Sequence, residues 1–92
     1  MKNREHDWLE PLNRLSRFCF YLEDMEMMDE IYGILMENRQ TISPYFNWQE
    51  DSSNRYVFCD DFVWQIGPKR NKQVIEFDEM VGMIRDLEED QF

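Results

Sequence analysis

The spacing of apolar residues changes twice along the chain, and these changes constrain the fold more than any other feature of the sequence. Up to residue 38, apolar side chains recur at the three- and four-residue intervals of amphipathic helices. After the turn-forming residues 41–44, aromatic and β-branched residues predict strands, and helical spacing returns after Asp78. Helices set apart from a run of strands predict an α+β fold with an antiparallel sheet of three to four strands.

Two amphipathic helices are expected before the sheet. The first runs from about Asp7 to Leu22, with Pro11 tolerated in its opening turn. Its apolar face contains Trp8, Leu12, Leu15, Phe18, Cys19 and Leu22. The second runs from Asp24, which suits an N-cap, to about Asn38. Because only a short step separates the two helices, the sequence predicts an antiparallel helix pair.

The predicted sheet uses residues 45–49, 55–59, 62–66 and 73–77, with a turn at residues 51–54 and a polar hairpin loop at residues 67–72. Asp78 is expected to cap a C-terminal helix. A chain of 92 residues makes one domain, residues 1–92, with one core. The predicted core contains Leu12, Leu15, Phe18, Ile31, Leu35, Phe58, Val74, Ile84 and Leu87.

The chain is strongly acidic, with 20 Asp and Glu against 10 Lys and Arg and a formal net charge of -10. Such a field repels nucleic acid and anionic membranes and attracts basic surfaces, so neither nucleic acid nor a membrane is the expected direct partner. Net charge also keeps proteins soluble, but a charge of this size on so small a chain exceeds what solubility needs.

No segment of the sequence has the features of a signal peptide or a membrane span, so a cytoplasmic location is expected. Cys19 and Cys59 are then two free, buried thiols. The sequence carries no signal that fixes an oligomeric state.

The residue types needed for catalysis are not found in a catalytic pattern. His6 is the one histidine and lies in a polar segment, while Cys19 fits the apolar face of a helix. Asp60 and Asp61 would disfavour a thiolate at Cys59. The acidic residues 23–30 lack the alternating oxygen ligands and central glycine of an EF-hand loop. The sequence therefore predicts a non-enzymatic protein that holds no metal and no cofactor.

Acidic residues gather in the second and last predicted helices. Residues 21–38 contain six acids and no base, and residues 76–92 contain seven acids and one base. Carboxylates three or four residues apart on a helix stand about 5–6 Å apart, similar to successive phosphates of a nucleic acid, and repel one another. Such a face could occupy the basic groove of a nucleic-acid-binding protein. The candidate partner-binding residues are Glu23, Glu26, Glu30, Glu37, Asp78, Glu79, Asp86 and Glu89.

In size, acidity and mixed α/β pattern, with its acidic helices at residues 23–37 and 78–90, the chain resembles small phage-type inhibitors. These include anti-CRISPR proteins and DNA-mimic anti-restriction proteins, and the resemblance involves no shared motif. It implies an inhibitor that acts in the bacterial host cytosol. Its partner would be a basic nucleic-acid-binding protein, such as a CRISPR effector, a restriction enzyme or a nuclease.

Two alternatives remain open at this point. Residues 44–47, followed by residues 51–52 and 56–58, resemble a strand segment of the all-β immunity proteins of ribonuclease colicins, which implies an antitoxin that neutralises a basic nuclease toxin. The second alternative is an adaptor whose apolar surface includes Tyr32, Met36 and aromatic residues of the sheet. Met25 and Met36 project away from the predicted core together with Tyr32, so they are candidates for partner contact.

Overall fold

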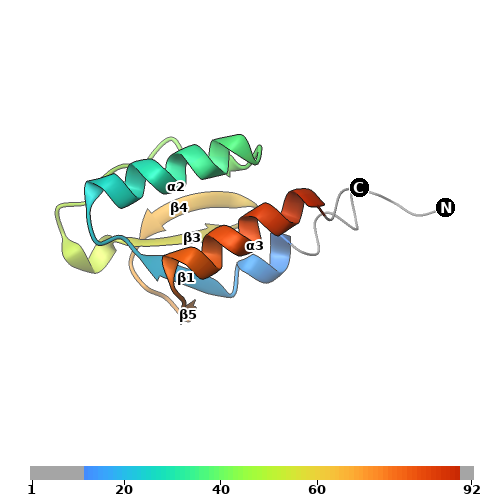
Figure 1. Ribbon diagram of the computed structural model, residues 1–92. Coiled ribbons are helices and arrows are strands. Elements are labelled where there is room, and N and C mark those ends of the chain that lie inside the picture. Colours follow the sequence, from blue (N-terminus) through green and yellow to red (C-terminus); the bar gives the residue numbers. More distant parts are fainter. Residues whose placement is uncertain (1–11, 90–92) are drawn as a thin grey trace.

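The computed structural model describes the backbone of residues 12–89 and the side chains of residues 12–87, and it has a layer of helices on one face of a five-stranded sheet (Figure 1). The predicted α+β class is confirmed. Residues 12–15 form a helical turn at the start of the described chain. The elements that follow are β1 (Phe18–Tyr21), α2 (Met25–Glu37), β2 (Thr41–Ile42), a 3-10 helix (Ser52–Asn54), β3 (Tyr56–Asp60), β4 (Val63–Gly67), β5 (Gln73–Val74) and α3 (Phe77–Glu89).

The sheet is mixed, with the strand order β2-β4-β3-β1-β5. β3 pairs antiparallel with β1 and β4, whereas β2 is parallel to β4 and β5 is parallel to β1. The prediction of an antiparallel sheet of three to four strands was therefore wrong in strand number and direction. The predicted hairpin at residues 67–72 was also wrong, because the chain crosses from β4 past β3 and β1 before β5 begins.

The largest correction concerns the first predicted helix, which does not continue to Leu22. The chain turns after residue 15 and enters β1, which lies between β3 and β5 in the sheet. Cys19 and Phe20 are adjacent and both fully buried, since neighbouring residues of a strand point to opposite faces of a sheet. The predicted helix start near Asp7 and the predicted apolar residue Trp8 lie outside the described residues.

The second and last helices agree closely with prediction. The Asp24 side chain caps α2 by accepting a hydrogen bond from the Met27 N–H at 2.8 Å. At the other end Arg39 adopts the left-handed region at φ 58°, and the Gln40 N–H donates to the Leu35 carbonyl at 2.9 Å. α3 begins at Phe77, one residue before the predicted cap.

Two of the predicted strands were misplaced. Residues 46–49 form no strand, and β2 at residues 41–42 takes the edge position instead. Phe46 packs into the core, while the Arg55 guanidinium stacks 4.3 Å from the Trp48 ring centroid and donates to the Gln49 carbonyl at 2.7 Å. These contacts hold the segment without strand pairing. β5 is only two residues long, because Phe77 already belongs to α3.

The core lies between the helices and the sheet. Phe20 of β1 contacts Phe77 of α3 edge to face, with ring centroids 5.5 Å apart. Trp64 of β4 is fully buried, and its indole Nε1–H donates to the Gln40 side-chain oxygen at 3.1 Å. Most of the predicted core is confirmed, but Phe18 is only partly buried. Val74 is 46% exposed because β5 is an edge strand.

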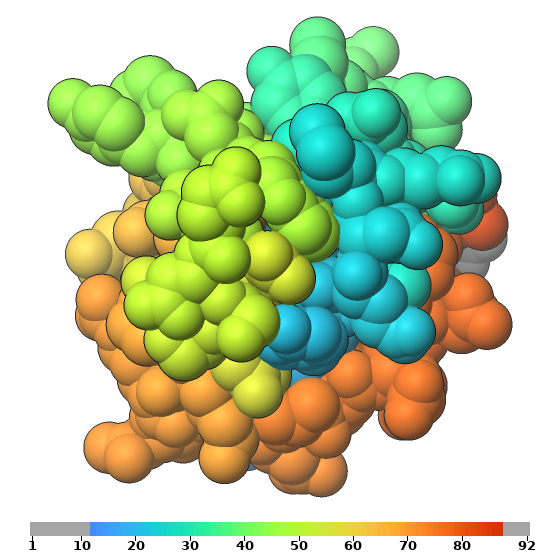
Figure 2. Space-filling model, turned by 90° about the vertical axis from the view of Figure 1, so that its left-hand side faces the viewer, coloured from blue at the N-terminus to red at the C-terminus, as the bar shows by residue number. Residues whose placement is uncertain are grey.

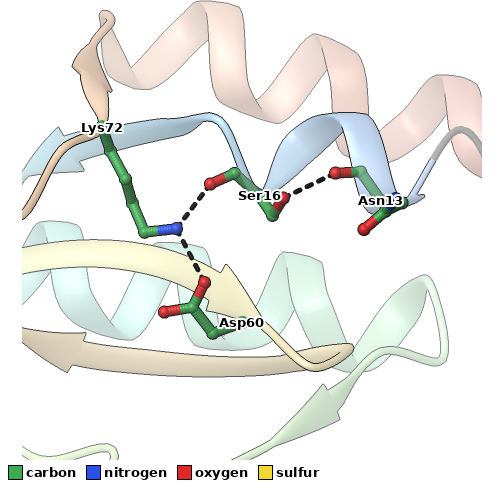
Figure 3. A network of polar contacts seen from close by, with 4 residues as sticks. All are labelled: Asn13, Ser16, Asp60 and Lys72. Atoms are coloured by element: carbon green, nitrogen blue, oxygen red, sulfur yellow. Dashed lines mark hydrogen bonds and ion pairs between the residues drawn. The ribbon is translucent and has the colours of Figure 1, made fainter.

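No helix of residues 12–89 lies on the other face of the sheet, which is covered in part by the β4–β5 loop. Arg70 and Lys72 of this loop lie 5.6 and 5.3 Å from the Phe58 ring centroid. The Lys72 Nζ donates to the Ser16 carbonyl and, at 2.7 Å, to Asp60 Oδ1 (Figure 3). The loop is thereby fixed over Phe58, which is buried although no helix of the described chain covers it.

Candidate protein-binding surface

The two acidic helices lie on the same face of the sheet. α2 and α3 run in the same direction over the strands, and their starting ends lie at the same end of the molecule (Figure 1). Acids that are separated by about fifty positions in the sequence therefore contribute to one helical layer. This layer brings together the two groups of predicted partner-binding residues.

On α2 the acids form a stripe, which we call the acidic stripe: Glu26, Glu30 and Glu37. All three side chains are exposed. At about 100° per residue they fall within an arc of about 40° on the helix surface. Glu23 lies just before the helix and is also exposed, and together with Met27 it lines a surface pocket. The structure thus places the α2 group of predicted residues on one side of the molecule.

On α3 the predicted residues Asp78, Glu79 and Asp86 are exposed. The Glu79 carboxylate also accepts a hydrogen bond from the Glu76 N–H at 3.2 Å, as in a capping box. The side chain of the remaining predicted residue, Glu89, lies outside the described residues.

The acids of the helices divide into those with a local structural role and those without one. Asp24 and Glu79 satisfy backbone N–H groups, and Glu26 and Asp78 lie in first turns, where the helix dipole favours negative charge. Glu37 lies in the last turn of α2, where the dipole disfavours a carboxylate, and no base accompanies it there. Glu30 has no capping contact either. The fold therefore explains only part of the acidity.

One group of basic residues lies on the opposite face of the sheet. The β4–β5 loop contains Lys69, Arg70 and Lys72 and no acid. Among the described side chains, the ion pair that forms joins Lys72 to Asp60, on the face without helices. No acid of α2 or α3 forms an ion pair with another described side chain. The helical layer therefore carries an excess of negative charge, with Arg85 as the one base of α3, while the β4–β5 loop carries positive charge that Asp60 neutralises in part.

Apolar side chains are exposed next to the acidic stripe. Met25, Tyr32 and Met36 of α2 are 56%, 42% and 59% exposed, which agrees with the prediction that they project away from the core. Tyr45 is 80% exposed on the neighbouring loop (Figure 2 shows this segment in lime beside α2 in teal). Sequence reasoning missed Tyr45 because it assigned the residue to a strand. The signal for a loop was Pro44, which precedes it.

The two cysteines have unreactive environments. Burial raises the pKa of the Cys19 thiol, although Lys69 and Lys72 oppose the shift. Burial, with the nearby Asp60 carboxylate, raises the pKa of the Cys59 thiol to about 12. Both thiols are free and buried, and they point to opposite faces of the sheet. Neither is placed to act as a thiolate nucleophile near neutral pH.

Within residues 12–87, no three His, Cys, Asp or Glu side chains are grouped so that they could hold a metal ion. His6 lies outside the described residues. No helix in the described part of the chain has the length and apolar character needed to cross a membrane.

Comparison of the chain with family models, with curated proteins and with solved structures finds no match.

Proposed function

We propose that the protein is a non-enzymatic inhibitor that binds a basic nucleic-acid-binding protein through the acidic surface of α2 and α3. The observation that carries this proposal is the collection of both acidic helices on one face of the sheet, with the two lysines and one arginine of the β4–β5 loop on the other. A basic partner is attracted to the helical layer and repelled by the loop, so the charge distribution orients the encounter.

The acids of α2 lower the stability of the helix, and this cost supports a functional role for them. Like charges at four-residue spacing on a helix destabilise it by about 0.2–0.5 kcal/mol per pair, and Glu26 and Glu30 have that spacing. Glu37 adds an unfavourable interaction with the helix dipole. Acids that oppose folding without a compensating partner within the described chain are expected where a partner supplies the cations.

The inhibitor would act by exclusion. Its carboxylates would displace the counterions held near the partner's lysines and arginines and would occupy the site that phosphates take. The partner class would then be a CRISPR effector, a restriction enzyme or a nuclease. A nuclease toxin neutralised by an immunity protein would use the same surface, so the identity of the partner distinguishes the two versions of the proposal.

The test combines capture with competition. Full-length protein is immobilised, bacterial lysate is passed over it, and captured proteins are identified by mass spectrometry. The same capture is repeated with the triple variant Glu26→Gln, Glu30→Gln, Glu37→Gln and with added double-stranded DNA or RNA. The proposal expects a basic nucleic-acid-binding protein whose capture falls with the variant and with nucleic acid. A partner that binds the variant and the wild type equally, and that nucleic acid does not displace, would contradict it.

A further inference from the structure

Three exposed apolar residues form a line along the outer surface of α2, which we call the apolar stripe: Met25, Tyr32 and Met36. Their positions are seven and four residues apart, so at about 100° per residue they fall within an arc of about 40°. They are 56%, 42% and 59% exposed, whereas Ile31 and Leu35 on the inner surface of the helix are fully buried. The stripe is therefore not part of the core.

The two sides of the apolar stripe differ in chemistry. On one side the Tyr32 ring contacts the ring of buried Phe46, with centroids 5.9 Å apart, so the loop that carries the exposed Tyr45 borders the stripe. On the other side lies the acidic stripe, whose centre is about 120° further round the helix. Asp29 is exposed between the two stripes. Figure 2 shows the loop standing beside α2 at the end where the helix begins.

This pattern matches the side of a helix that packs against another helix. Met25, Asp29, Tyr32 and Met36 repeat at the four- and three-residue intervals of a helix–helix seam, and three of these four positions are apolar. α2 has 13 residues and is therefore about 20 Å long, which accommodates three to four turns of a second helix.

We infer that the apolar stripe is the docking site for a basic amphipathic helix of the protein partner. The inference rests on the proposed function and names the partner's contacting element. Apolar side chains of that helix would pack on Met25, Tyr32 and Met36, while its lysines or arginines would face Asp29 and the acidic stripe. Several classes of nucleic-acid-binding protein present such a basic helix to nucleic acid.

Charge favours a basic helix over a second copy of the chain as the occupant of the apolar stripe. Two copies packed through the same stripe would bring two acidic stripes together, and each copy already has a net charge of -10. Like charges placed opposite one another across an interface disfavour association. A basic helix removes that repulsion and buries the same apolar surface.

The probe for the test is an 18-residue leucine–lysine peptide with its leucines on one helical face. A fluorescent label on the peptide reports its affinity for the full-length protein at several salt concentrations. The variants are Tyr32→Ala with Met36→Ala, and separately Glu26→Gln with Glu30→Gln. Val74→Ala is the matched control, because Val74 is 46% exposed but lies on the opposite edge strand of the sheet. A scrambled peptide of equal composition controls for charge alone.

We expect the Tyr32→Ala, Met36→Ala variant to weaken peptide binding about tenfold, while the Val74→Ala variant and wild type bind equally. The Glu26→Gln, Glu30→Gln variant should weaken binding mainly at low salt. Equal affinity for the scrambled peptide, or no effect of the Tyr32 and Met36 changes, would overturn the docking site and leave the acidic-surface proposal standing. If the Tyr32 and Met36 changes weaken binding as expected but peptide affinity does not depend on salt, the docking site stands and the proposed function is overturned. Wild-type dimers in sedimentation that dissociate on Tyr32→Ala would show that a second copy covers the stripe.

Discussion

Lys72 is the residue that fixes the chain on the face of the sheet without helices. Its ammonium group bridges the Ser16 carbonyl before β1 and the Asp60 carboxylate at the end of β3, and its side chain is only 11% exposed. Residues far apart in the sequence are thus joined through one cation (Figure 3). Nothing in the local sequence distinguishes Lys72 from Lys69 and Arg70, since the three share a polar loop.

Replacing Lys72 should therefore cost far more than replacing its neighbour. In Lys72→Met the Ser16 carbonyl and the half-buried Asp60 lose their partner, and we expect the free energy of unfolding to fall by about 1–3 kcal/mol. Lys69→Met is the matched control and should change it by less than about 0.5 kcal/mol, because Lys69 is exposed and makes no described hydrogen bond or ion pair. Urea unfolding measures both. Equal stabilities for the two variants would show that the bridge contributes nothing.

Cys59 makes stability depend on pH in the alkaline range. Its pKa is raised from 9.0 to about 12, so the folded protein keeps the thiol neutral where the unfolded chain ionises. The contribution is fully present below pH 9.0 and is lost as pH rises towards about 12. Between these limits, wild type should lose stability relative to Cys59→Ala by a difference on the order of a few kcal/mol. Chemical unfolding at stepped pH gives the difference, and parallel pH profiles would refute it.

At the scale of elements, β1 is the part of the fold that sequence reasoning assigned wrongly. A helix was predicted here because apolar residues recur at three- and four-residue intervals, at Leu12, Leu15, Phe18 and Cys19. The contrary signal was the run from Phe18 to Leu22, five residues without a charged side chain, as in strands buried on both faces. Residues 18–21 form a strand and not a helix because β3 and β5, from distant parts of the chain, pair with them. Local periodicity contains no information about that pairing.

Because β1 is an interior strand, Phe20→Ala should be among the most damaging single changes in the protein. Phe20 is fully buried and contacts Phe77, so we expect a loss of about 3–5 kcal/mol in unfolding free energy. Tyr45→Ala serves as the control, since Tyr45 is 80% exposed and its loss should be nearly neutral. A Phe20→Ala protein with the stability of the Tyr45→Ala protein would place residues 18–21 outside the core.

The acids of α2 should separate into two classes in stability measurements. Asp24→Ala removes the N-cap hydrogen bond to Met27 and should cost about 1 kcal/mol. Glu37→Lys replaces an acid by a base in the last turn and should gain about 0.3–1 kcal/mol. Thermal unfolding at low salt measures both changes. A destabilising effect of Glu37→Lys would mean that Glu37 has a structural role, and it would weaken the argument that its carboxylate serves a partner.

The sequence predicted α2 and the start of α3 more accurately than it predicted the sheet. Asp24 and the apolar spacing of residues 27–35 are local signals, and local signals determine where a helix begins. The order of the strands and the two parallel pairs follow from contacts between distant segments. The acidic residues of the candidate surface could be named from charge alone, but their position on one sheet face required the topology.

For the whole molecule, we propose that the location of the negative charge, and not its total amount, determines partner binding. Both acidic helices lie on one face, and the β4–β5 loop places Lys69, Arg70 and the Asp60-paired Lys72 on the other. If total charge were sufficient, acids elsewhere in the chain would serve equally well. Glu50 and Asp61 are exposed acids that lie outside α2 and α3, and they allow the two explanations to be compared.

The most direct test measures the affinity of the captured partner against salt concentration for two variants of equal net charge. Glu26→Gln with Glu30→Gln removes two charges from α2, and Glu50→Gln with Asp61→Asn removes two from elsewhere. We expect wild-type affinity to fall steeply as salt rises through the range where the Debye length is about 8 Å. The α2 variant should bind about tenfold more weakly at low salt with a shallower salt dependence, while the other variant should behave as wild type. Equal behaviour of the two variants, or binding that salt does not affect, would contradict the proposal.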